Sequence, residues 1–435
     1  MSIRGWLDKI RFRRYRLVEV PGLLRTPLGR SEIWYVFLHF AWPVTSRLAA
    51  LYRRLVLRKV PIVAVVGSFG KTTTARAIGA ALGKSVGSRE ENTAMATLPG
   101  ALFRIKPGGE AAVLEIGIEG PGHMASIAST MRPDIVVVTS IGSEHNRSFK
   151  SLDVTRDEKA HMVRVLPSSG AAVLNGDDPN VLWMAGQTRA RVVTFGFGEG
   201  NQVRATDPRL EWPGGMRFRL HVAGEEREVG LRLLGRHMIY PALAAVSVAM
   251  LRGERLDDVI ARLAALPPAM NRLTPRPLVN GALLLCDARK SALETIHAAL
   301  DVLVEIPASR KIVVVGPINE PVGSQYALYR ALGARIARIA QLAVFVDSYR
   351  KYEAGLRRAG MPLDACLDAG QGVSGAVEFL RRELRPGDVV LIKGRRSQKL
   401  ERIALALEGR PVRCRLIACH LQATHCDHCP MLEKG

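Results

Sequence analysis

The sequence predicts an α/β fold with two domains, a larger central one built on a parallel sheet and a smaller Rossmann-like C-terminal one. Apolar runs of strand length alternate with helical patterns in two separate series. A proline-rich joint at 266–275 separates the series. The length of 435 residues and an apolar fraction of 48% suit two or three domains with sizeable cores.

The first apolar run, 61–66, leads directly into Gly-Ser-Phe-Gly-Lys-Thr-Thr-Thr at 67–74. The glycines let backbone N–H groups turn toward a polyphosphate, and the helix predicted over 72–82 adds the positive end of its dipole. Lys71 can reach β- and γ-phosphates, and the Thr72 hydroxyl can hold Mg²⁺. An ordinary strand–turn–helix is the alternative, but the order of residues favours a P-loop that binds ATP. The predicted nucleotide contacts in this loop are Gly67, Ser68, Phe69, Gly70, Lys71, Thr72 and Thr73.

Three further apolar runs predict parallel strands of the same sheet: 111–116, 134–139 and 171–175. Glu115, His145 and Asn175 stand at or just beyond their carboxyl ends. Ligands of open α/β sheets bind at this edge. We therefore expect these polar residues to share one site with the phosphate loop.

The chain changes character over 192–234, and the alternating apolar and polar residues at 217–222 and 227–233 predict antiparallel strands. Beyond the joint, four more strands are predicted at 282–286, 311–315, 342–346 and 389–392. The predicted domains are a basic aromatic segment at 1–60, the central ATP-binding domain at 61–275, the C-terminal domain at 276–408 and a Cys/His-rich tail at 409–435.

Positive charge is concentrated in the N-terminal segment. The formal charge of the chain is +22, and residues 1–60 hold 13 Lys and Arg against three acids, together with three of the five tryptophans. The apolar stretch at 33–44 is too short to span a bilayer, and no signal-peptide cleavage site follows it. This pattern favours attachment to an anionic membrane surface, with a helical pair packed on the protein body as the alternative. Nucleic acid is not an expected partner, because no recognition fold surrounds the segment.

The tail concentrates cysteines: Cys414, Cys419, Cys426 and Cys429. The last two form a C-x₂-C pair, which can supply half of a tetrahedral Zn²⁺ site. A redox-active or disordered tail, or one that binds a protein partner, is the competing interpretation.

Taken in order, the central motifs resemble those of the Mur ligase family. They are the phosphate loop, Leu-Glu-Ile-Gly at 114–117, Thr-x-Ile-Gly-x-x-His at 139–145, a lysine at 159 and Asn-x-Asp-Asp at 175–178. The resemblance covers about residues 61–408 and is strongest to the branch that attaches D-alanyl-D-alanine to a muramoyl tripeptide. It implies an ATP-dependent ligase that forms an amide bond through an acyl phosphate.

The resemblance also implies roles for individual residues. Thr72 and Glu115 would ligate one Mg²⁺, and His145 a second together with Lys159, which is carbamylated in the family. Arg272 would reach the γ-phosphate from the domain joint. Asn175, Asp287 and Lys393 would contribute to nucleotide binding.

The chain departs from the family where the nucleotide base and the amine substrate bind. Gly235-Arg-His-Met-Ile-Tyr-Pro241 lacks both asparagines of the family pattern Gly-x-His-Asn-x-x-Asn, and the segments 286–293 and 316–322 are also rewritten. Residues 1–60 are too short for the family's UDP-sugar domain. We therefore expect a cytoplasmic ligase, peripheral at the inner face of the membrane, that joins a small amine to a lipid-linked or polymeric carboxylate. A polyglutamate-type polymerising ligase and a catalytically degenerate nucleotide-binding partner are the alternatives.

Overall fold

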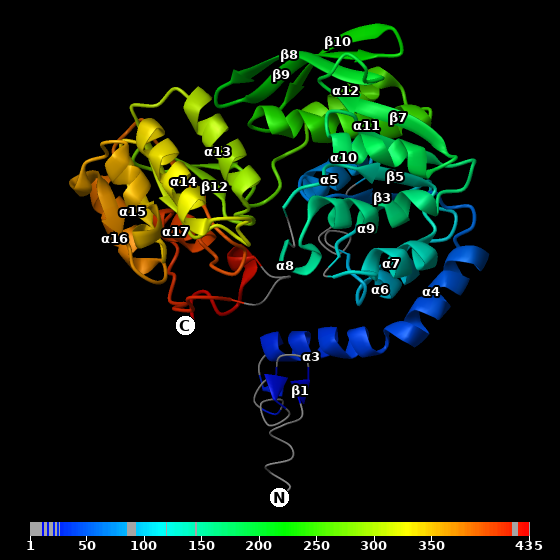
Figure 1. Cartoon of the computed structure of the whole chain (residues 1–435), viewed down its shortest axis with the longest axis horizontal. Helices are drawn as coiled ribbons and strands as arrows, with labels where there is room; N and C mark the ends of the chain where they lie inside the picture. Colours follow the sequence, from blue (N-terminus) through cyan, green and yellow to red (C-terminus); the bar gives the residue numbers. More distant parts are fainter. Residues whose placement is uncertain are drawn as a thin grey trace, which may run out of the picture.

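The structure, a computed structural model, describes residues 11–12, 15–16, 21, 24–25, 27–84, 93–118, 120–143, 146–419 and 425–434. Two sheets with helices on their faces dominate it (Figure 1). The N-terminal elements are β1 (Arg11–Phe12), β2 (Tyr15–Arg16), α3 (Pro27–Phe40) and α4 (Trp42–Leu55). Among the described residues, no helix combines the length and the apolar character needed to cross a membrane.

The larger sheet has eight strands in the order β10-β9-β8-β7-β6-β5-β3-β4. Their bounds are β3 (Ile62–Val66), β4 (Ala112–Glu115), β5 (Ile135–Val138), β6 (Ala171–Asn175), β7 (Arg191–Gly196), β8 (Val203–Glu211), β9 (Gly215–Val222) and β10 (Glu225–Leu231). Strands β3 to β7 pair in parallel, and β8, β9 and β10 pair with one another antiparallel. The parallel strands β3 to β6 and the antiparallel pair β9 and β10 are as predicted, whereas β7, at the start of the 192–234 stretch, still pairs in parallel with β6 and β8.

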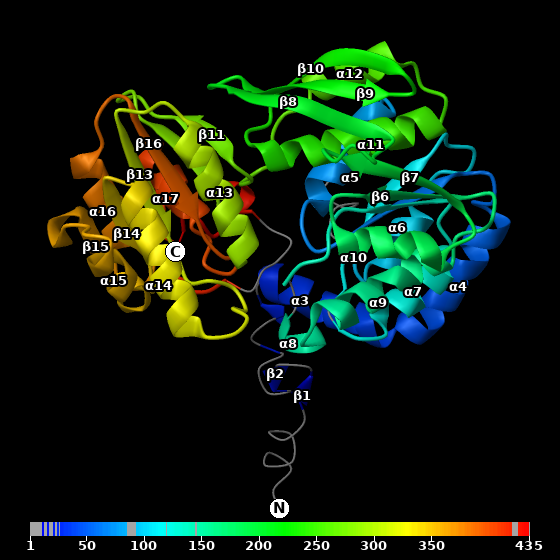
Figure 2. The same cartoon turned by 45° about the horizontal axis from the view of Figure 1, so that its top comes forward.

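Helices cover both faces of this sheet (Figure 2). Their bounds are α5 (Lys71–Ala81), α6 (Leu98–Phe103), α7 (His123–Met131), α8 (Asn146–Phe149), α9 (Leu152–Arg164), α10 (Pro179–Leu182), α11 (Ile239–Leu251) and α12 (Leu256–Ala264). Alternate residues of β3 enter different cores: Val63 and Val65 pack with α5 and α11, and Ile62, Ala64 and Val66 with α6, α7 and α9. The unbroken apolar run at 62–66 therefore reflects a strand buried on both faces.

The second sheet has six strands in the order β11-β12-β16-β13-β14-β15, all parallel except β11. The strands are β11 (Thr274–Pro277), β12 (Leu283–Asp287), β13 (Arg310–Val315), β14 (Leu342–Phe345), β15 (Cys366–Asp368) and β16 (Asp388–Lys393). The helices are α13 (Leu293–Glu305), α14 (Gln325–Ile339), α15 (Tyr349–Arg358), α16 (Ser374–Glu383) and α17 (Glu401–Leu407). The predicted α/β fold class is confirmed in both parts, while the domain limits chosen from the sequence stay a prediction.

Candidate active site

The phosphate loop joins β3 to α5 and depends on two glycines. Gly67 has φ +143° and Gly70 has φ +81°, in the region that favours glycine. A Cβ atom at Gly67 would lie 2.0 Å from the Thr139 hydroxyl oxygen, so no larger residue fits there. The backbone can therefore fold closely over the end of β5.

The segment after β5 holds this loop in place. The Ser68 N–H donates to the Ser140 carbonyl at 2.7 Å, and the Phe69 N–H donates to the Ser140 hydroxyl at 3.1 Å. The Gly142 N–H donates to Ser68 Oγ at 2.8 Å. These hydrogen bonds join the carboxyl ends of β3 and β5, so the N–H groups of the loop are held in fixed positions.

Two buried lysines end at this loop. Lys71 Nζ donates to the Gly67 carbonyl at 2.8 Å, and Lys159 Nζ on α9 donates to Ser68 Oγ at 2.8 Å. Only 3% of Lys159 is exposed. Its neighbour Glu158 accepts the N–H groups of Gly122 and Met124 at the start of α7, which fixes α9 against that helix.

Glu115, at the end of β4, has the character of a metal ligand. It is 3% exposed, and its Oε2 atom has no hydrogen-bond partner among the described residues. A buried carboxylate oxygen without a partner is costly, and a hard cation such as Mg²⁺ would satisfy it. Thr72, also buried, is the second candidate ligand. His145 lies outside the described residues, so its role stays a prediction.

The domain joint and the C-terminal domain also reach the loop. Arg272 donates to the Thr72 hydroxyl at 3.0 Å, and its contact with the γ-phosphate stays a prediction. Lys290 Nζ donates to the Ser68 carbonyl at 3.3 Å and lies 5.7 Å from the centre of the Phe69 ring. Sequence reasoning missed Lys290. The available signal was the presence of a basic residue in segment 286–293, which departs from the family pattern.

Arg396 adds to the positive charge around the site. The pKa of Arg396 is lowered to about 9, first by burial and then by the charges of Arg289 and Arg272, while Glu115 acts in the opposite direction. Sequence reasoning also missed Arg396, which lies in the basic run Lys-Gly-Arg-Arg at 393–396. Glu401 acts in the same direction as Glu115, so several cations that repel one another are gathered beside two carboxylates. An excess of positive charge of this kind suits a polyphosphate.

The other predicted nucleotide contacts make structural bonds. Asn175 Nδ2 donates to the Thr139 carbonyl at 2.9 Å, which ties the end of β6 to β5. Lys393 and Asp287 form an ion pair at 2.5 Å, and Lys393 is only 1% exposed. Burial lowers the pKa of Lys393, and the Asp287 carboxylate opposes that shift. Their contact with nucleotide stays a prediction.

The region that lost the family asparagines is filled by other contacts. The Arg236 guanidinium lies 4.4 Å above the Phe197 ring, and the Tyr240 hydroxyl donates to Asp177 Oδ2 at 2.9 Å. Burial, followed by the Asp177 charge, raises the pKa of Tyr240. Burial also lowers the pKa of His237 to about 4, so this ring is neutral at physiological pH.

The described part of the tail, 409–419 and 425–434, does not contain the predicted zinc site. Within residues 11–434, leaving aside the gaps given above, no three His, Cys, Asp or Glu side chains gather as a metal-binding group. Cys426 instead packs with Leu405 and Leu432 in a small apolar cluster. The Cys414 carbonyl accepts a hydrogen bond from Arg402. Cys429 packs against the same cluster, whereas the Cys419 N–H donates to the Ser397 carbonyl, so the two pairs of cysteines have separate surroundings.

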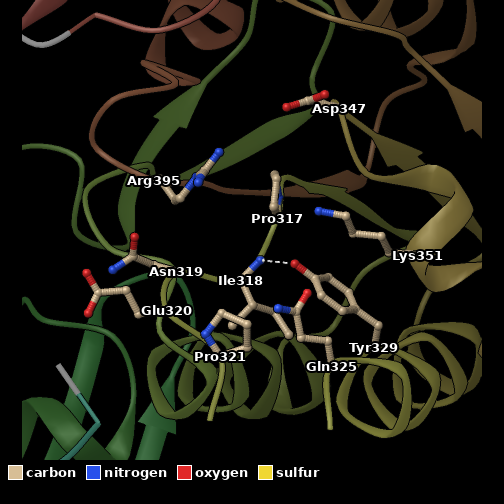
Figure 3. Close-up of a pocket in the computed structure, with 10 residues that line it drawn as sticks. All are labelled: Pro317, Ile318, Asn319, Glu320, Pro321, Gln325, Tyr329, Asp347, Lys351 and Arg395. Atoms are coloured by element: carbon tan, nitrogen blue, oxygen red, sulfur yellow. Dashed lines mark hydrogen bonds between the residues drawn. The ribbon is translucent and has the colours of Figure 1, made fainter. Parts of the chain in front are cut away.

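A cavity of about 190 Å³ opens at the carboxyl ends of β13 and β14 (Figure 3). Lys351 and Arg395 lie on opposite sides of Pro317, and the Ile318 N–H donates to the Tyr329 hydroxyl at 2.8 Å. The other lining residues are Asn319, Glu320, Pro321, Gln325 and Asp347. The rewritten segment 316–322 thus forms one wall of a polar cavity with both signs of charge.

The loop, the buried acid and the surrounding cations define a nucleotide-binding enzyme in which the C-terminal domain reaches the phosphate loop. The family profile described as Mur ligase middle domain matches residues 65–249. The UDP-N-acetylmuramoyl-tripeptide–D-alanyl-D-alanine ligase of Mycobacterium tuberculosis is 30% identical over 388 residues, which cover 82% of this chain and 75% of that protein. The Escherichia coli ligase of the same name is 32% identical over 280 residues, 63% of this chain and 61% of that protein.

Solved structures show the same fold. MurF from Acinetobacter baumannii superposes with a TM-score of 0.74 at 24% identity, covering 85% of this chain and 81% of that one. MurF from Thermotoga maritima, solved in complex with ADP, gives 0.73 at 22% identity, covering 85% and 84%. The chain belongs to the Mur ligase family. It is an ATP-dependent ligase that forms an amide bond between an acid and an amine, which confirms the predicted class.

Proposed function

We propose that this ligase joins a small amine to a carboxylate carried on a membrane-associated or polymeric substrate, through an acyl-phosphate intermediate. The observation that supports it best is the convergence of Lys71, Arg272 and Lys290 on one loop beside Glu115, whose Oε2 atom has no hydrogen-bond partner among the described residues. Phosphoryl transfer needs this concentration of positive charge, together with fixed positions for the reacting groups.

In the proposed reaction, a carboxylate oxygen of the substrate attacks the γ-phosphorus of ATP. The bond from that phosphorus to the β–γ bridging oxygen breaks, which leaves ADP and an acyl phosphate. The amine nitrogen then attacks the acyl carbon, phosphate departs, and the nitrogen loses a proton to give the amide. Lys71, Lys290 and Arg272 neutralise the phosphate oxygens throughout.

The residues present fit Mg²⁺. Thr72 and Glu115 would hold one ion, and His145 with carbamylated Lys159 a second. Bound Mg²⁺ would neutralise charge on the β- and γ-phosphates. Lys159 already ends at the loop, where a carbamate on its nitrogen would add an anionic oxygen ligand.

The amine substrate fits the cavity of Figure 3 if it also bears a carboxylate. Lys351 and Arg395 can receive a carboxylate, and Glu320 can receive an ammonium group. The relatives named above act on a UDP-muramoyl tripeptide and D-alanyl-D-alanine, according to their names. Because segment 316–322 is rewritten, we propose an amino acid or short peptide other than that dipeptide. We also propose that the enzyme works in the cytoplasm, peripheral to the inner face of the membrane, where a lipid-linked carboxylate would be available.

The test is ADP formation by the full chain with a panel of amino acids and dipeptides as amines and cell-envelope extracts as the carboxylate source. Mass spectrometry should detect a product that has lost one water relative to its two parts. Lys159→Ala should abolish turnover, while Lys106→Ala, at an exposed lysine, should not. If no combination stimulates ADP formation, and Lys159→Ala leaves the biological role intact, the chain is a nucleotide-binding partner and the ligase proposal fails. Repeated addition of one amino acid would identify the polymerising alternative.

A further inference from the structure

Helix α4 is bound firmly to the central domain by one face. Trp42 Nε1 donates to the Ser126 hydroxyl on α7 at 3.2 Å, and Ala49 is fully buried. Arg53 is also buried, with Nη2 2.7 Å from Asp134 Oδ2. These contacts leave the opposite face of α4 directed away from the protein.

That outward face is apolar. On α4 it consists of Val44, Leu48, Leu51 and Leu55, which recur at spacings of four, three and four residues and so form one line along the helix. Between 52% and 66% of each is exposed. Outward-facing helix surfaces are normally polar, and contiguous exposed apolar patches mark interaction sites.

The line continues onto α3. Trp34, Phe37 and Phe40 are 53–65% exposed, and the rings of Trp34 and Phe37 stack with their centres 5.4 Å apart. We call the seven residues on both helices the α3–α4 stripe. Both views place these helices at the end of the central domain opposite β8, β9 and β10 (Figures 1 and 2).

Basic side chains accompany the stripe. Arg47 and Arg54 are exposed, and their spacing of seven residues places them along one edge of the apolar line. Arg58 and Lys59 are exposed just beyond the helix. Glu32 is the single acid in the sequence from 27 to 60. An apolar line with a basic edge matches a lipid interface, where acyl chains meet anionic headgroups.

We propose that the α3–α4 stripe docks this enzyme on an anionic lipid bilayer. The apolar side chains would enter the interface with α4 parallel to its plane, and the arginines would bind lipid phosphates. A second copy of this chain is a poorer occupant, because it would bring the same excess of positive charge to the contact. The docking surface itself does not depend on the proposed function. Its biological role does rest on that function, since attachment would bring the active site to a lipid-linked carboxylate.

Co-sedimentation of the full chain with vesicles, without nucleotide, tests this directly. Binding should be strong to vesicles that contain phosphatidylglycerol, weak to pure phosphatidylcholine, and weakened by salt. The double variant Leu48→Glu/Leu51→Glu should lower the partition coefficient by about a hundredfold, from lost apolar burial and added repulsion. The matched control Val304→Glu/Leu363→Glu changes two exposed apolar residues of the C-terminal domain and should bind like the unmodified chain.

Arg47→Gln/Arg54→Gln should reduce the preference for anionic lipid while leaving the helices folded, as checked by circular dichroism. Equal binding by the Leu48/Leu51 variant and the unmodified chain would overturn the proposal. The proposal would also be overturned if the unmodified chain failed to bind vesicles and instead formed a dimer in light scattering that the Leu48/Leu51 variant dissociates. Vesicle binding by a chain that forms no amide would leave the docking surface intact and refute the proposed function alone.

Discussion

Replacing Glu115 with glutamine should separate the activity of this enzyme from its stability. The side chain is 3% exposed, and its Oε2 atom has no hydrogen-bond partner among the described residues. Glutamine has almost the same shape but no charge. The substitution therefore removes the anion that we assign to Mg²⁺ without opening a cavity.

The two free-energy terms differ in size. Relief of a buried, incompletely bonded carboxylate is worth about 1–3 kcal/mol, and the lost attraction for Arg396 opposes it. We expect the free energy of unfolding to change by no more than about 1 kcal/mol in either direction. Loss of the carboxylate that would hold Mg²⁺ beside the phosphates should cost about 2.7–4 kcal/mol in the transition state, a hundredfold to thousandfold fall in kcat.

Urea denaturation measures the first quantity, and ADP release over a range of Mg²⁺ concentrations measures the second. Glu110→Gln is the matched control, because that acid precedes the same strand but has an 87% exposed side chain. A Glu115→Gln enzyme with full kcat and an unchanged Mg²⁺ dependence would refute the metal assignment. A large loss of stability would show that the carboxylate has a structural partner instead.

Three further predictions concern other contacts. Arg53→Met should lower the free energy of unfolding by about 3 kcal/mol, because it removes the buried guanidinium that bonds Asp134 and several main-chain carbonyls. The exposed Arg54→Met is the control in the same denaturation series. Lys290→Ala should raise KM for ATP about tenfold by removing a charge at the phosphate loop, and an unchanged KM would contradict this contact. The pKa of His237 is lowered from 6.5 to about 4, so the unfolded chain binds the proton first as pH falls. Stability should therefore be complete above about pH 6.5 and decline by about 3 kcal/mol toward pH 4, and His237→Asn should flatten this part of the curve.

Local patterns were enough to predict the centre of the site. A glycine-rich loop that follows an apolar strand lies at the carboxyl edge of a parallel sheet. Polar residues at the ends of neighbouring parallel strands lie at the same edge, however the helices pack. Lys159 needed the family resemblance, because a single lysine on a helix has no local signature. Its contact with Ser68 joins residues 91 positions apart.

The cysteine tail shows where spacing misleads. A C-x₂-C pair favours a metal site only if further ligands converge on it, and convergence depends on how the tail packs. Cys426 contacts Leu405 and Leu432 because of the tertiary packing of the tail, which the composition of the tail does not predict. The outward direction of Leu48 and Leu51 is similar, since the same residues would line a core if α4 were rotated by half a turn.

The sequence by itself determined the fold class, the phosphate loop and the family, because each depends on short-range patterns of apolar, glycine and charged residues. Tertiary structure alone decided which distant residues complete the site. It brought Lys290 and Arg272 to the loop, paired Lys393 with Asp287, and turned the apolar side of α4 outward. The physical reason is that these contacts join segments whose meeting is set by the packing of two domains and not by any local preference of the chain.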